Sequence, residues 1–288
     1  MWIIYAFISA LFAGITSILA KIGVKNTDSH VATALRSVII LIFSWLMVFV
    51  VGSQNTIYSI TSKSFLFLIL SGLTTGASWI CYFKALQLGN VNKVVPIDKS
   101  STILTMVLAF IFLGEPIKNN MIIGLVFIGI GTFAIIQKTN NSTETIKEKN
   151  SLWLIYALFS ALFASLTSIL GKIGIENVES NLGTAIRTIV VLIMAWAIVF
   201  GLNKQKEIKK IDKKSLIFIG ISGLTTGLSW LFYYRALQEG RASVVVPIDK
   251  LSILVTVLFA YIFLNEKLSK KALIGLIMIV VGTIALIF

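Results

Sequence analysis

An internal duplication that runs the length of the sequence limits what this chain can fold into. Residues 71–100, SGLTTGASWICYFKALQLGNVNKVVPIDKS, return as residues 222–251, SGLTTGLSWLFYYRALQEGRASVVVPIDKL, so that Asp98 recurs as Asp249, 151 positions later. The same offset relates Trp2/Trp153, Tyr5/Tyr156, Lys21/Lys172, Arg36/Arg187 and Glu115/Glu266. Because residue type and position agree without a gap, the sequence predicts two copies of one structural unit.

Each copy is dominated by apolar runs. The 288 residues are 57% hydrophobic and only 13% charged, with a mean hydropathy of +0.94. In the first copy the runs cover residues 2–22, 31–51, 65–88, 91–113 and 117–136, and each is long enough to cross a bilayer as a helix. We therefore predict an all-α, multi-pass membrane protein with ten transmembrane helices.

The predicted organisation is a five-helix repeat over residues 1–137, a hydrophilic linker over 138–151 and a second five-helix repeat over 152–288. Five spans are an odd number, so the second repeat must enter the membrane from the opposite side. Inverted repeats of this kind are typical of secondary transporters, whose sites lie between the repeats. The first run lacks a basic leader and has a counterpart at 152–171, so we interpret it as a span and not a signal peptide.

The net charge of +13 does not indicate nucleic-acid binding, because most lysines lie in loops between apolar runs, where they set membrane orientation. One side of the membrane receives a lysine-rich set: Lys204, Lys206, Lys209, Lys210, Lys213, Lys214, Lys267, Lys270, Lys271 and the linker lysines. The positive-inside rule places this side in the cytoplasm and both termini outside. The single cysteine, Cys81, and single histidine, His30, predict no disulfide, metal site or cofactor.

Charged residues inside the apolar runs are the best functional clue, since such groups are costly in a bilayer and usually mark a pathway. The sequence suggests two charged clusters near opposite membrane faces: Arg36, Lys84, Asp98 and Lys99 in one copy, and Arg187, Arg235, Asp249 and Lys250 in the other. We expect Asp98 to pair with Lys84 or Arg36, and Asp249 with Arg235 or Arg187. Such pairs form either a gate or a static ion pair that sets helix register. The surplus bases are expected to face water, headgroups or an anionic ligand.

Prolines, tryptophans and glycines accompany these charges. Pro96 and Pro247 precede each Ile-Asp-Lys and predict a helix kink beside it. Trp79 and Trp230 are candidates for either a cavity wall or core packing. The GxxxG pairs Gly72/Gly76 and Gly223/Gly227 favour close helix packing. Gly124/Gly131 and Gly275/Gly282 predict a further seam, between the halves or between protomers.

These features together resemble the EamA family of the drug/metabolite transporter superfamily. The resemblance rests on an Ala-Leu segment after an aromatic-rich third run, a proline early in the fourth run, and FLGEP (112–116) or FLNEK (263–267) before the fifth. It implies a ten-helix carrier of the inner (cytoplasmic) membrane, often an exporter of amino acids or other small metabolites, with a central cavity between the repeats. It also implies cytoplasmic termini, the reverse of what the lysine distribution predicts, and a monomer or homodimer in the bilayer.

The leading functional hypothesis is therefore a secondary transporter, an exporter or exchanger, of small metabolites such as amino acids or organic anions. It would work by alternating access between the two repeats, with a small-molecule substrate and the bilayer as its partners. The alternative is a flippase for a lipid-linked or amphiphilic substrate. An intramembrane enzyme is disfavoured, because acid–base or metal chemistry needs convergent histidine or carboxylate groups that this sequence lacks.

Overall fold

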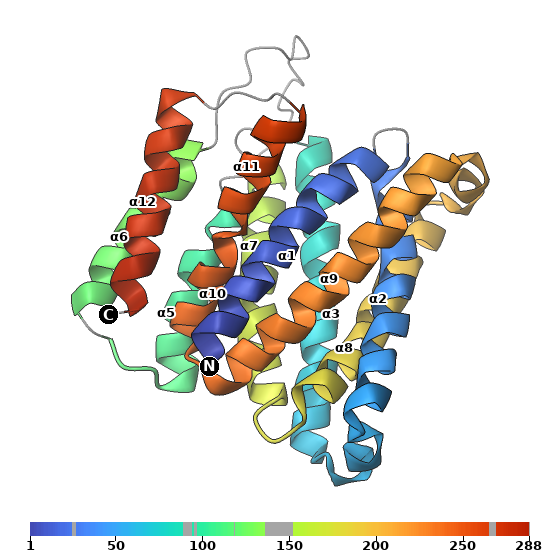
Figure 1. Ribbon diagram of the computed structural model, residues 1–288, viewed down its shortest axis with the longest axis horizontal. Helices are drawn as coiled ribbons and strands as arrows, with labels where there is room; N and C mark the ends of the chain where they lie inside the picture. Colours follow the sequence, from blue (N-terminus) through green and yellow to red (C-terminus); the bar gives the residue numbers. More distant parts are fainter. Residues whose placement is uncertain are drawn as a thin grey trace.

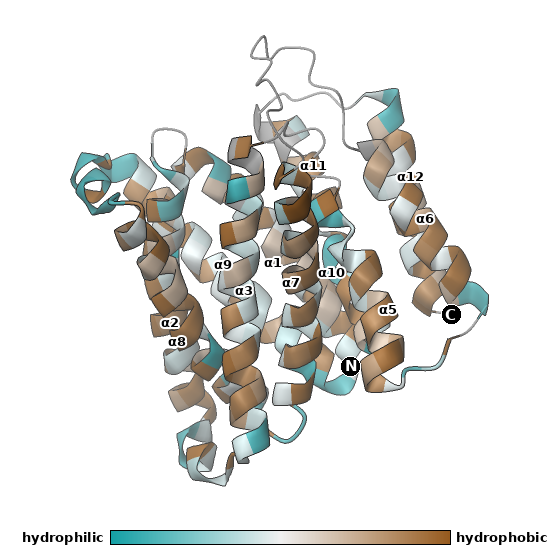
Figure 2. Cartoon of the chain, turned by 180° about the vertical axis from the view of Figure 1, so that it is seen from behind, coloured by the Kyte–Doolittle hydropathy of each residue, from teal (hydrophilic) through white to brown (hydrophobic). Residues whose placement is uncertain are grey.

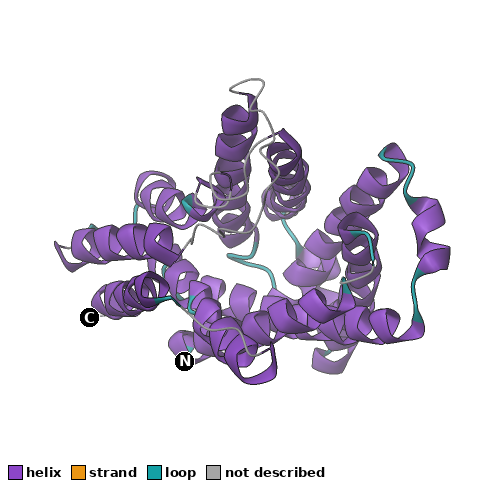
Figure 3. Cartoon of the chain, turned by 90° about the horizontal axis from the view of Figure 1, so that it is seen from above, coloured by secondary structure: helices purple, strands orange, loops and turns teal. Residues whose placement is uncertain are grey.

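The computed structural model describes residues 1–24, 27–88, 94, 97–117, 119–135, 152–264 and 269–287. Within these ranges all regular secondary structure is helical, and the long helices lie side by side in one bundle (Figures 1 and 3). The helices of the first half are α1 (Trp2–Gly23), α2 (Ser29–Val51), η1 (Ser53–Ser59), α3 (Ser62–Leu88), α5 (Ser101–Leu113) and α6 (Asn119–Ile135). Those of the second half are α7 (Leu152–Gly174), α8 (Ser180–Gly201), η2 (Gln205–Lys210), α9 (Lys213–Glu239), α10 (Ala242–Lys250), α11 (Ser252–Leu264) and α12 (Lys270–Ile287).

The helices have the length and composition of membrane spans. Eight stretches of the described chain are long and apolar enough to cross a bilayer, and residues 119–134 form a shorter apolar helix. Hydrophobic residues cover the flanks of the helices, whereas hydrophilic residues gather at their ends (Figure 2). The chain is therefore an all-helical, multi-pass membrane protein. The count of ten spans stays a prediction, because much of the fourth run, including 89–93 and 95–96, falls outside the described residues.

The closest helix packing joins one half of the chain to the other. Helix α1 packs on α9, α3 on α7, α2 on α8 and α6 on α12. The first helix of each half thus contacts the third of the other, while second pairs with second and fifth with fifth. The α6/α12 pair stands beside the main bundle (Figure 1). Because the contacts are reciprocal, the two halves form one interlocked unit and not two separate domains.

Glycines allow these interlocked helices to approach closely, as their spacing predicted. A Cβ on Gly72 or Gly76 of α3 would lie 2.6 Å from Val190 or Met194 of α8. A Cβ on Gly223 or Gly227 of α9 would likewise meet Ile39 or Phe43 of α2. The seam predicted from the terminal glycines is also confirmed, and it lies between the halves: Gly124 and Gly131 of α6 face Gly282 and Gly275 of α12.

We expect Gly131→Ala to disrupt the α6/α12 seam. The added Cβ would lie 2.5 Å from the carbonyl oxygen of Gly275, and a backbone atom cannot relieve the clash by a rotamer change as a side chain can. Overpacking of this kind costs about 1–3 kcal/mol. SDS titration of the protein in mixed micelles measures the loss. Gly129→Ala is the matched control, since its Cβ would meet only the end of the Ile103 side chain at 3.1 Å. Equal stability of the two variants would contradict the seam.

Both termini lie at one end of the bundle, which we call the terminal end (Figure 1). The opposite end carries η2 and the starts of α9 and α12, with Lys206, Lys209, Lys210, Lys213, Lys214, Lys270 and Lys271. We call it the lysine-rich end. The lysines that the sequence assigned to one side of the membrane therefore lie at one end of the bundle, and the termini lie at the other.

At the lysine-rich end, an ion pair links the segment before α2 to the segment after α8. Asp28 caps α2 by accepting hydrogen bonds from the backbone amides of His30 and Val31, and its carboxylate also accepts one from Lys204 Nζ. Burial raises the pKa of Asp28, but Lys204 and the two amides outweigh it and hold the pKa below its usual value. The carboxylate therefore stays ionised at neutral pH, and its contribution to stability is lost only as the pH falls through the lowered pKa.

Candidate functional site

A helix break near the middle of a span positions the second Asp-Lys pair. Helix α10 contains Pro247 and ends at Lys250, Leu251 forms a turn, and α11 starts at Ser252. In the first half, residues 97–99 are helical, Ser100 forms the corresponding turn and α5 follows, while Pro96 lies outside the described residues. The Asp249-Lys250 pair thus lies at an internal break between the short helices α10 and α11, and the placement of the two pairs near opposite membrane faces stays a prediction.

The two aspartates are held by serines of the opposite half. Asp98 Oδ1 accepts a hydrogen bond from Ser160 Oγ at 2.7 Å, and Asp249 Oδ1 accepts one from Ser9 Oγ at the same distance. Each serine also contacts a second serine, so that Ser160 lies 3.4 Å from Ser78 and Ser9 lies 3.2 Å from Ser229, measured between hydroxyl oxygens. These two clusters are equivalent at the 151-residue offset.

The ion pairs expected for these aspartates do not form. Within the described residues, no Asp98 contact to Lys84 or Arg36 and no Asp249 contact to Arg235 or Arg187 is present. Arg235 instead pairs with Glu239, one turn further along α9, at 2.7 Å. The reason is position: the break places each aspartate beside the first helix of the other half, whereas the basic residues lie on second and third helices nearer the bundle ends.

The two equivalent arginines have different environments. Arg36 Nη2 donates to Thr226 Oγ1 at 2.6 Å, and its Nε is buried without a hydrogen-bond partner. Arg187 is only 2% exposed; its Nε donates to Ser71 Oγ at 3.1 Å and its Nη2 to Thr75 Oγ1 at 2.6 Å. Its guanidinium carbon lies 5.0 Å from the ring centroid of Trp230 and 4.8 Å from that of Tyr234. Arg187 is therefore occluded by cation–π contacts.

A central cavity of about 580 Å³ lies on the Arg36 side of this arrangement. Arg36, Lys99, Trp79 and Trp230 line it, together with the smaller residues Ala13, Thr16, Ser17, Thr33, Thr226 and Ser229. Both interpretations of the tryptophans describe part of what is seen, because Trp79 and Trp230 line the cavity and also pack against core clusters. Trp230 contributes to the cavity wall and also contacts Arg187, so its indole separates the cavity from the occluded arginine.

A second cavity of about 310 Å³ adjoins the first, because Ser17 and Lys99 line both. Its other polar residues include Lys250, Thr102 and Thr256. Lys99 lies at the helix break and its exposed surface faces these two cavities. Residues of the two predicted clusters therefore line neighbouring cavities: Arg36 and Lys99 line the first, and Lys99 and Lys250 line the second. Among the described residues, the lining of both cavities contains no carboxylate.

Two sets of contacts near the terminal end were missed by sequence reasoning. The Glu115 carboxylate accepts hydrogen bonds from Ala242 N at 2.6 Å, Ser243 N at 3.0 Å and Ser243 Oγ, and so caps the start of α10. Lys172 Nζ donates to the carbonyl oxygens of Leu237 and Gly240 at 2.5 Å, beside the end of α9. The available signal was the Glu115/Glu266 repeat within FLGEP and FLNEK; Glu266 lies outside the described residues.

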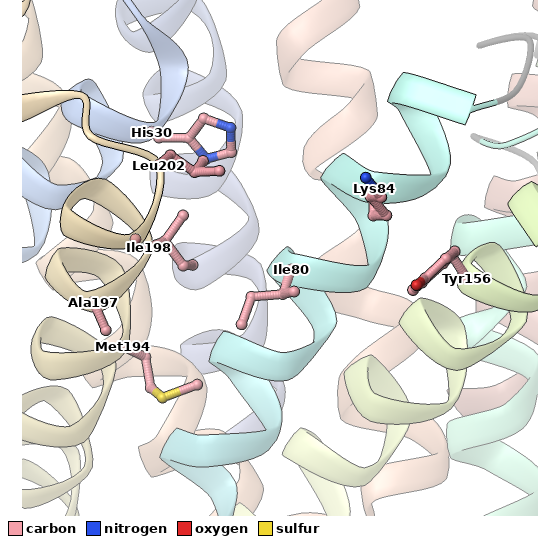
Figure 4. Close-up of a pocket in the computed structure, with 9 residues that line it drawn as sticks. His30, Ile80, Lys84, Tyr156, Met194, Ala197, Ile198 and Leu202 are labelled. Carbon is pink, nitrogen blue, oxygen red and sulfur yellow. The ribbon is translucent and has the colours of Figure 1, made fainter.

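A pocket of about 400 Å³ opens between α3 and α8 toward the lysine-rich end, and we call it the first wedge (Figure 4). Lys84 and Ile80 of α3 and Tyr156 of α7 face Met194, Ala197, Ile198 and Leu202 of α8, with His30 of α2 beside Leu202. Lys84 thus faces this pocket and does not line the central cavity.

A second wedge of about 270 Å³ is the counterpart of the first. The offset of 151 relates the lining residues Lys84/Arg235, Tyr156/Tyr5, His30/Asn181, Ile80/Leu231, Ile198/Met47 and Leu202/Val51. A crevice of only about 10 Å³ lies between the first wedge and the central cavity, sharing His30 and Ile198 with the one and Thr33 and Trp79 with the other. Within the described residues, no group of three or more His, Cys, Asp or Glu side chains could hold a metal ion.

Comparison with known proteins identifies relatives. A family model for the EamA-like transporter family matches residues 1–137 and 151–288. An uncharacterized transporter encoded in the cobO 3' region of Sinorhizobium sp is 40% identical over 134 residues, which cover 95% of that protein but 46% of this chain. An uncharacterized transporter of Bacillus subtilis is 24% identical over 207 residues, 71% of this chain and 64% of the relative. A solved crystal structure shares the fold, with a TM-score of 0.80, 13% identity, and coverage of 99% of this chain and 97% of its own.

Proposed function

Because the chain belongs to the EamA-like transporter family, we propose that it is a secondary transporter of small organic anions or zwitterions such as amino acids. In this proposal two inverted five-helix repeats alternate access to a site between them. The reciprocal packing of α1 on α9 and α3 on α7 supports the inversion, because each half meets the other through equivalent helices. The Sinorhizobium relative, which matches about one repeat over nearly its whole length, supports a duplicated unit.

The observation that carries the substrate class is the charge of the cavity. Arg36, Lys99 and Lys250 line the two adjoining cavities, whereas the carboxylates of Asp98 and Asp249 accept hydrogen bonds from Ser160 and Ser9. An uncompensated cation in a low-dielectric site is costly, so a bound anion would stabilise it. The buried Nε of Arg36, which has no hydrogen-bond partner, supplies a donor for a carboxylate or phosphate oxygen.

Alternating access is supported by the unequal states of the two arginines. Arg36 lines the cavity, whereas its counterpart Arg187 is occluded between Trp230 and Tyr234. In the opposite state we propose that Arg187 lines the cavity and Arg36 is covered, as the pseudo-symmetry of the halves requires. The terminal end, where Glu115 and Lys172 make their contacts, is the closed side of the present state.

We assign the protein to the cytoplasmic membrane, with the lysine-rich end in the cytoplasm as the positive-inside rule predicts. Thr33 and Arg36, near the start of α2, then place the cavity in the half of the molecule that faces the cytoplasm. This arrangement suits an exporter or an exchanger, because either loads substrate from that side.

The proposal is tested by counterflow in liposomes with labelled organic acids and amino acids as candidate substrates. We expect uptake of anions or zwitterions and none of organic cations. Asp98→Asn and Asp249→Asn should each slow transport of a confirmed substrate by about 10- to 100-fold, the equivalent of one hydrogen bond to a charged group. Asp212→Asn is the matched control, because Asp212 caps α9 outside the span. Parental rates in both aspartate variants would show that the aspartates are structural, and selective cation transport would overturn the substrate class.

A flippase for an amphiphilic substrate is the second candidate, favoured by the two wedges on the flanks of the bundle. It predicts that purified protein in vesicles moves a fluorescent lipid from the inner to the outer leaflet, where dithionite destroys its fluorescence. Transport of soluble anions without lipid movement would reject this candidate.

A further inference from the structure

We propose that the first wedge, between α3 and α8, binds an anionic phospholipid of the surrounding leaflet. In this assignment Lys84 and the Tyr156 hydroxyl hold the lipid phosphate, and one acyl chain runs along Ile80, Met194 and Ile198. The site lies outside the central cavity, so it does not depend on the identity of the transported solute.

The shape of the wedge follows from helix contacts. Helices α3 and α8 touch where Gly72 and Gly76 admit Val190 and Met194, and they diverge beyond that point. Gly76 and Lys84 are eight residues apart, so the wedge is about 12 Å deep along α3 at 1.5 Å per residue. Lys84 lies four residues before the end of α3 at Leu88, about 6 Å from it. The depth therefore suits part of an acyl chain, and Lys84 lies near the level of the headgroups.

The walls and the mouth of the wedge differ in chemistry. Below Lys84 the walls are apolar, and Ile80 and Leu202 are each 45% exposed on the flank of the helices. At the mouth are Lys84, Tyr156 and His30 (Figure 4). Basic pockets between membrane helices on the cytoplasmic side recognise anionic headgroups, and the lysine-rich end of this protein is the side that the charge rule places in the cytoplasm.

Charge pairing distinguishes the two wedges. Within the described residues, Lys84 has no carboxylate within 4.0 Å, whereas Arg235 of the second wedge is neutralised by Glu239 at 2.7 Å. The second wedge is also smaller, at about 270 Å³ against 400 Å³. Of the two wedges, the first is therefore the one whose basic residue has no carboxylate partner among the described residues, and it lies at the lysine-rich end.

A membrane lipid suits this wedge better than a soluble metabolite does. The crevice between the wedge and the central cavity has a volume of about 10 Å³. A single water molecule needs about 10–15 Å³, so a metabolite cannot pass between the two spaces in this state. The wedge is thus a separate pocket on a surface that the hydrocarbon of the bilayer covers, and lipid is the abundant amphiphile there.

Native mass spectrometry of detergent-solubilised protein tests the proposal with phosphatidylglycerol and phosphatidylcholine of equal chain length. We expect the parental protein to prefer phosphatidylglycerol, and Lys84→Gln to weaken that binding about fivefold while leaving phosphatidylcholine unaffected, as the loss of one basic residue predicts. Gly201→Trp should weaken binding of both lipids by filling the wedge. This variant is suitable because Gly201 of α8 lines the wedge and no atom lies within 4 Å of a Cβ added to it.

Three matched variants serve as controls, and each should bind both lipids as the parent does. Lys63→Gln removes an exposed lysine at the terminal end, Arg235→Gln removes the paired base of the second wedge, and Phe200→Trp adds bulk to an exposed flank residue beside Gly201. Equal losses in Lys84→Gln and Lys63→Gln would overturn the assignment in favour of diffuse charge attraction. If Gly201→Trp binds both lipids as the parent does, the assignment is overturned, because the lipids then do not bind in the wedge.

Discussion

Glu115→Ala is expected to destabilise the protein by about 3 kcal/mol, because it removes a charged acceptor from three buried hydrogen bonds at once. The backbone amides of Ala242 and Ser243 are the first two of α10, and both donate hydrogen bonds to the Glu115 carboxylate. A carboxylate at this position also interacts favourably with the helix dipole of α10. SDS titration in mixed micelles, followed by tryptophan fluorescence, measures the loss.

Two further variants show whether the capping contacts cause this loss. Glu115→Gln keeps one acceptor oxygen but turns an amide donor toward the helix start, so we expect an intermediate effect. Glu176→Ala removes an exposed carboxylate from the turn after α7 and should change stability by less than about 0.5 kcal/mol. If Glu115→Ala unfolds at the same SDS concentration as the parent, the cap does not stabilise the terminal end.

The architecture was largely predictable from sequence, because the signals that define it are repeated and local. Apolar runs of sufficient length predicted the membrane helices, and eight of them are found within the described chain. The glycine spacing predicted two kinds of close approach, and both are present. The order of packing, in which α1 meets α9 and α3 meets α7, could not be obtained in this way, since hydropathy reports length and burial but not neighbours.

The contacts of the candidate site could not be predicted from sequence. Asp98 and Asp249 were chosen as charges within apolar runs, and their role stays a prediction; their partners Ser160 and Ser9 are ordinary small residues within apolar runs. Nothing in the composition of such a run distinguishes a serine that binds a carboxylate from one that packs against a helix. The wedges had a usable signal, because Tyr5/Tyr156 and Lys84/Arg235 keep the repeat offset. Only the fold shows that Tyr156 and Lys84 share one pocket and that Tyr5 and Arg235 share the other.

The difference between the two halves is the property that a duplicated sequence cannot predict. Arg36 and Arg187 have matching sequence contexts, and each donates to the equivalent threonine, Thr226 or Thr75. Among the described side chains, Trp230 and Tyr234 cover Arg187, which is only 2% exposed, whereas Arg36 lines the central cavity. If the two repeats exchange roles as proposed, the environments of the two arginines would be exchanged as well.

Arg36→Gln and Arg187→Gln are therefore both expected to reduce transport of an anionic substrate by about 10- to 100-fold, the equivalent of one charge-assisted hydrogen bond. The reduction at Arg36 is expected because this residue lines the cavity in the present state. The reduction at Arg187 is expected although it is only 2% exposed, because it would recognise substrate after the repeats exchange roles. Zero-trans flux in liposomes of uniform protein orientation gives both rates.

The membrane face at which each arginine variant loses substrate affinity shows whether that arginine recognises substrate or only stabilises the fold. Arg36→Gln should raise the half-saturating substrate concentration at the lysine-rich face, and Arg187→Gln should raise it at the terminal face, with little change at the opposite one. Arg36→Lys and Arg187→Lys should restore part of the affinity, because lysine keeps the charge but not the two-pronged geometry of the guanidinium. If Arg187→Gln lowers stability alone and leaves half-saturation unchanged at both faces, Arg187 is a packing residue of the closed end. The cavity would then recognise its anion through Arg36 and the lysines in a single state, and the pseudo-symmetry of the arginines would have no role in transport.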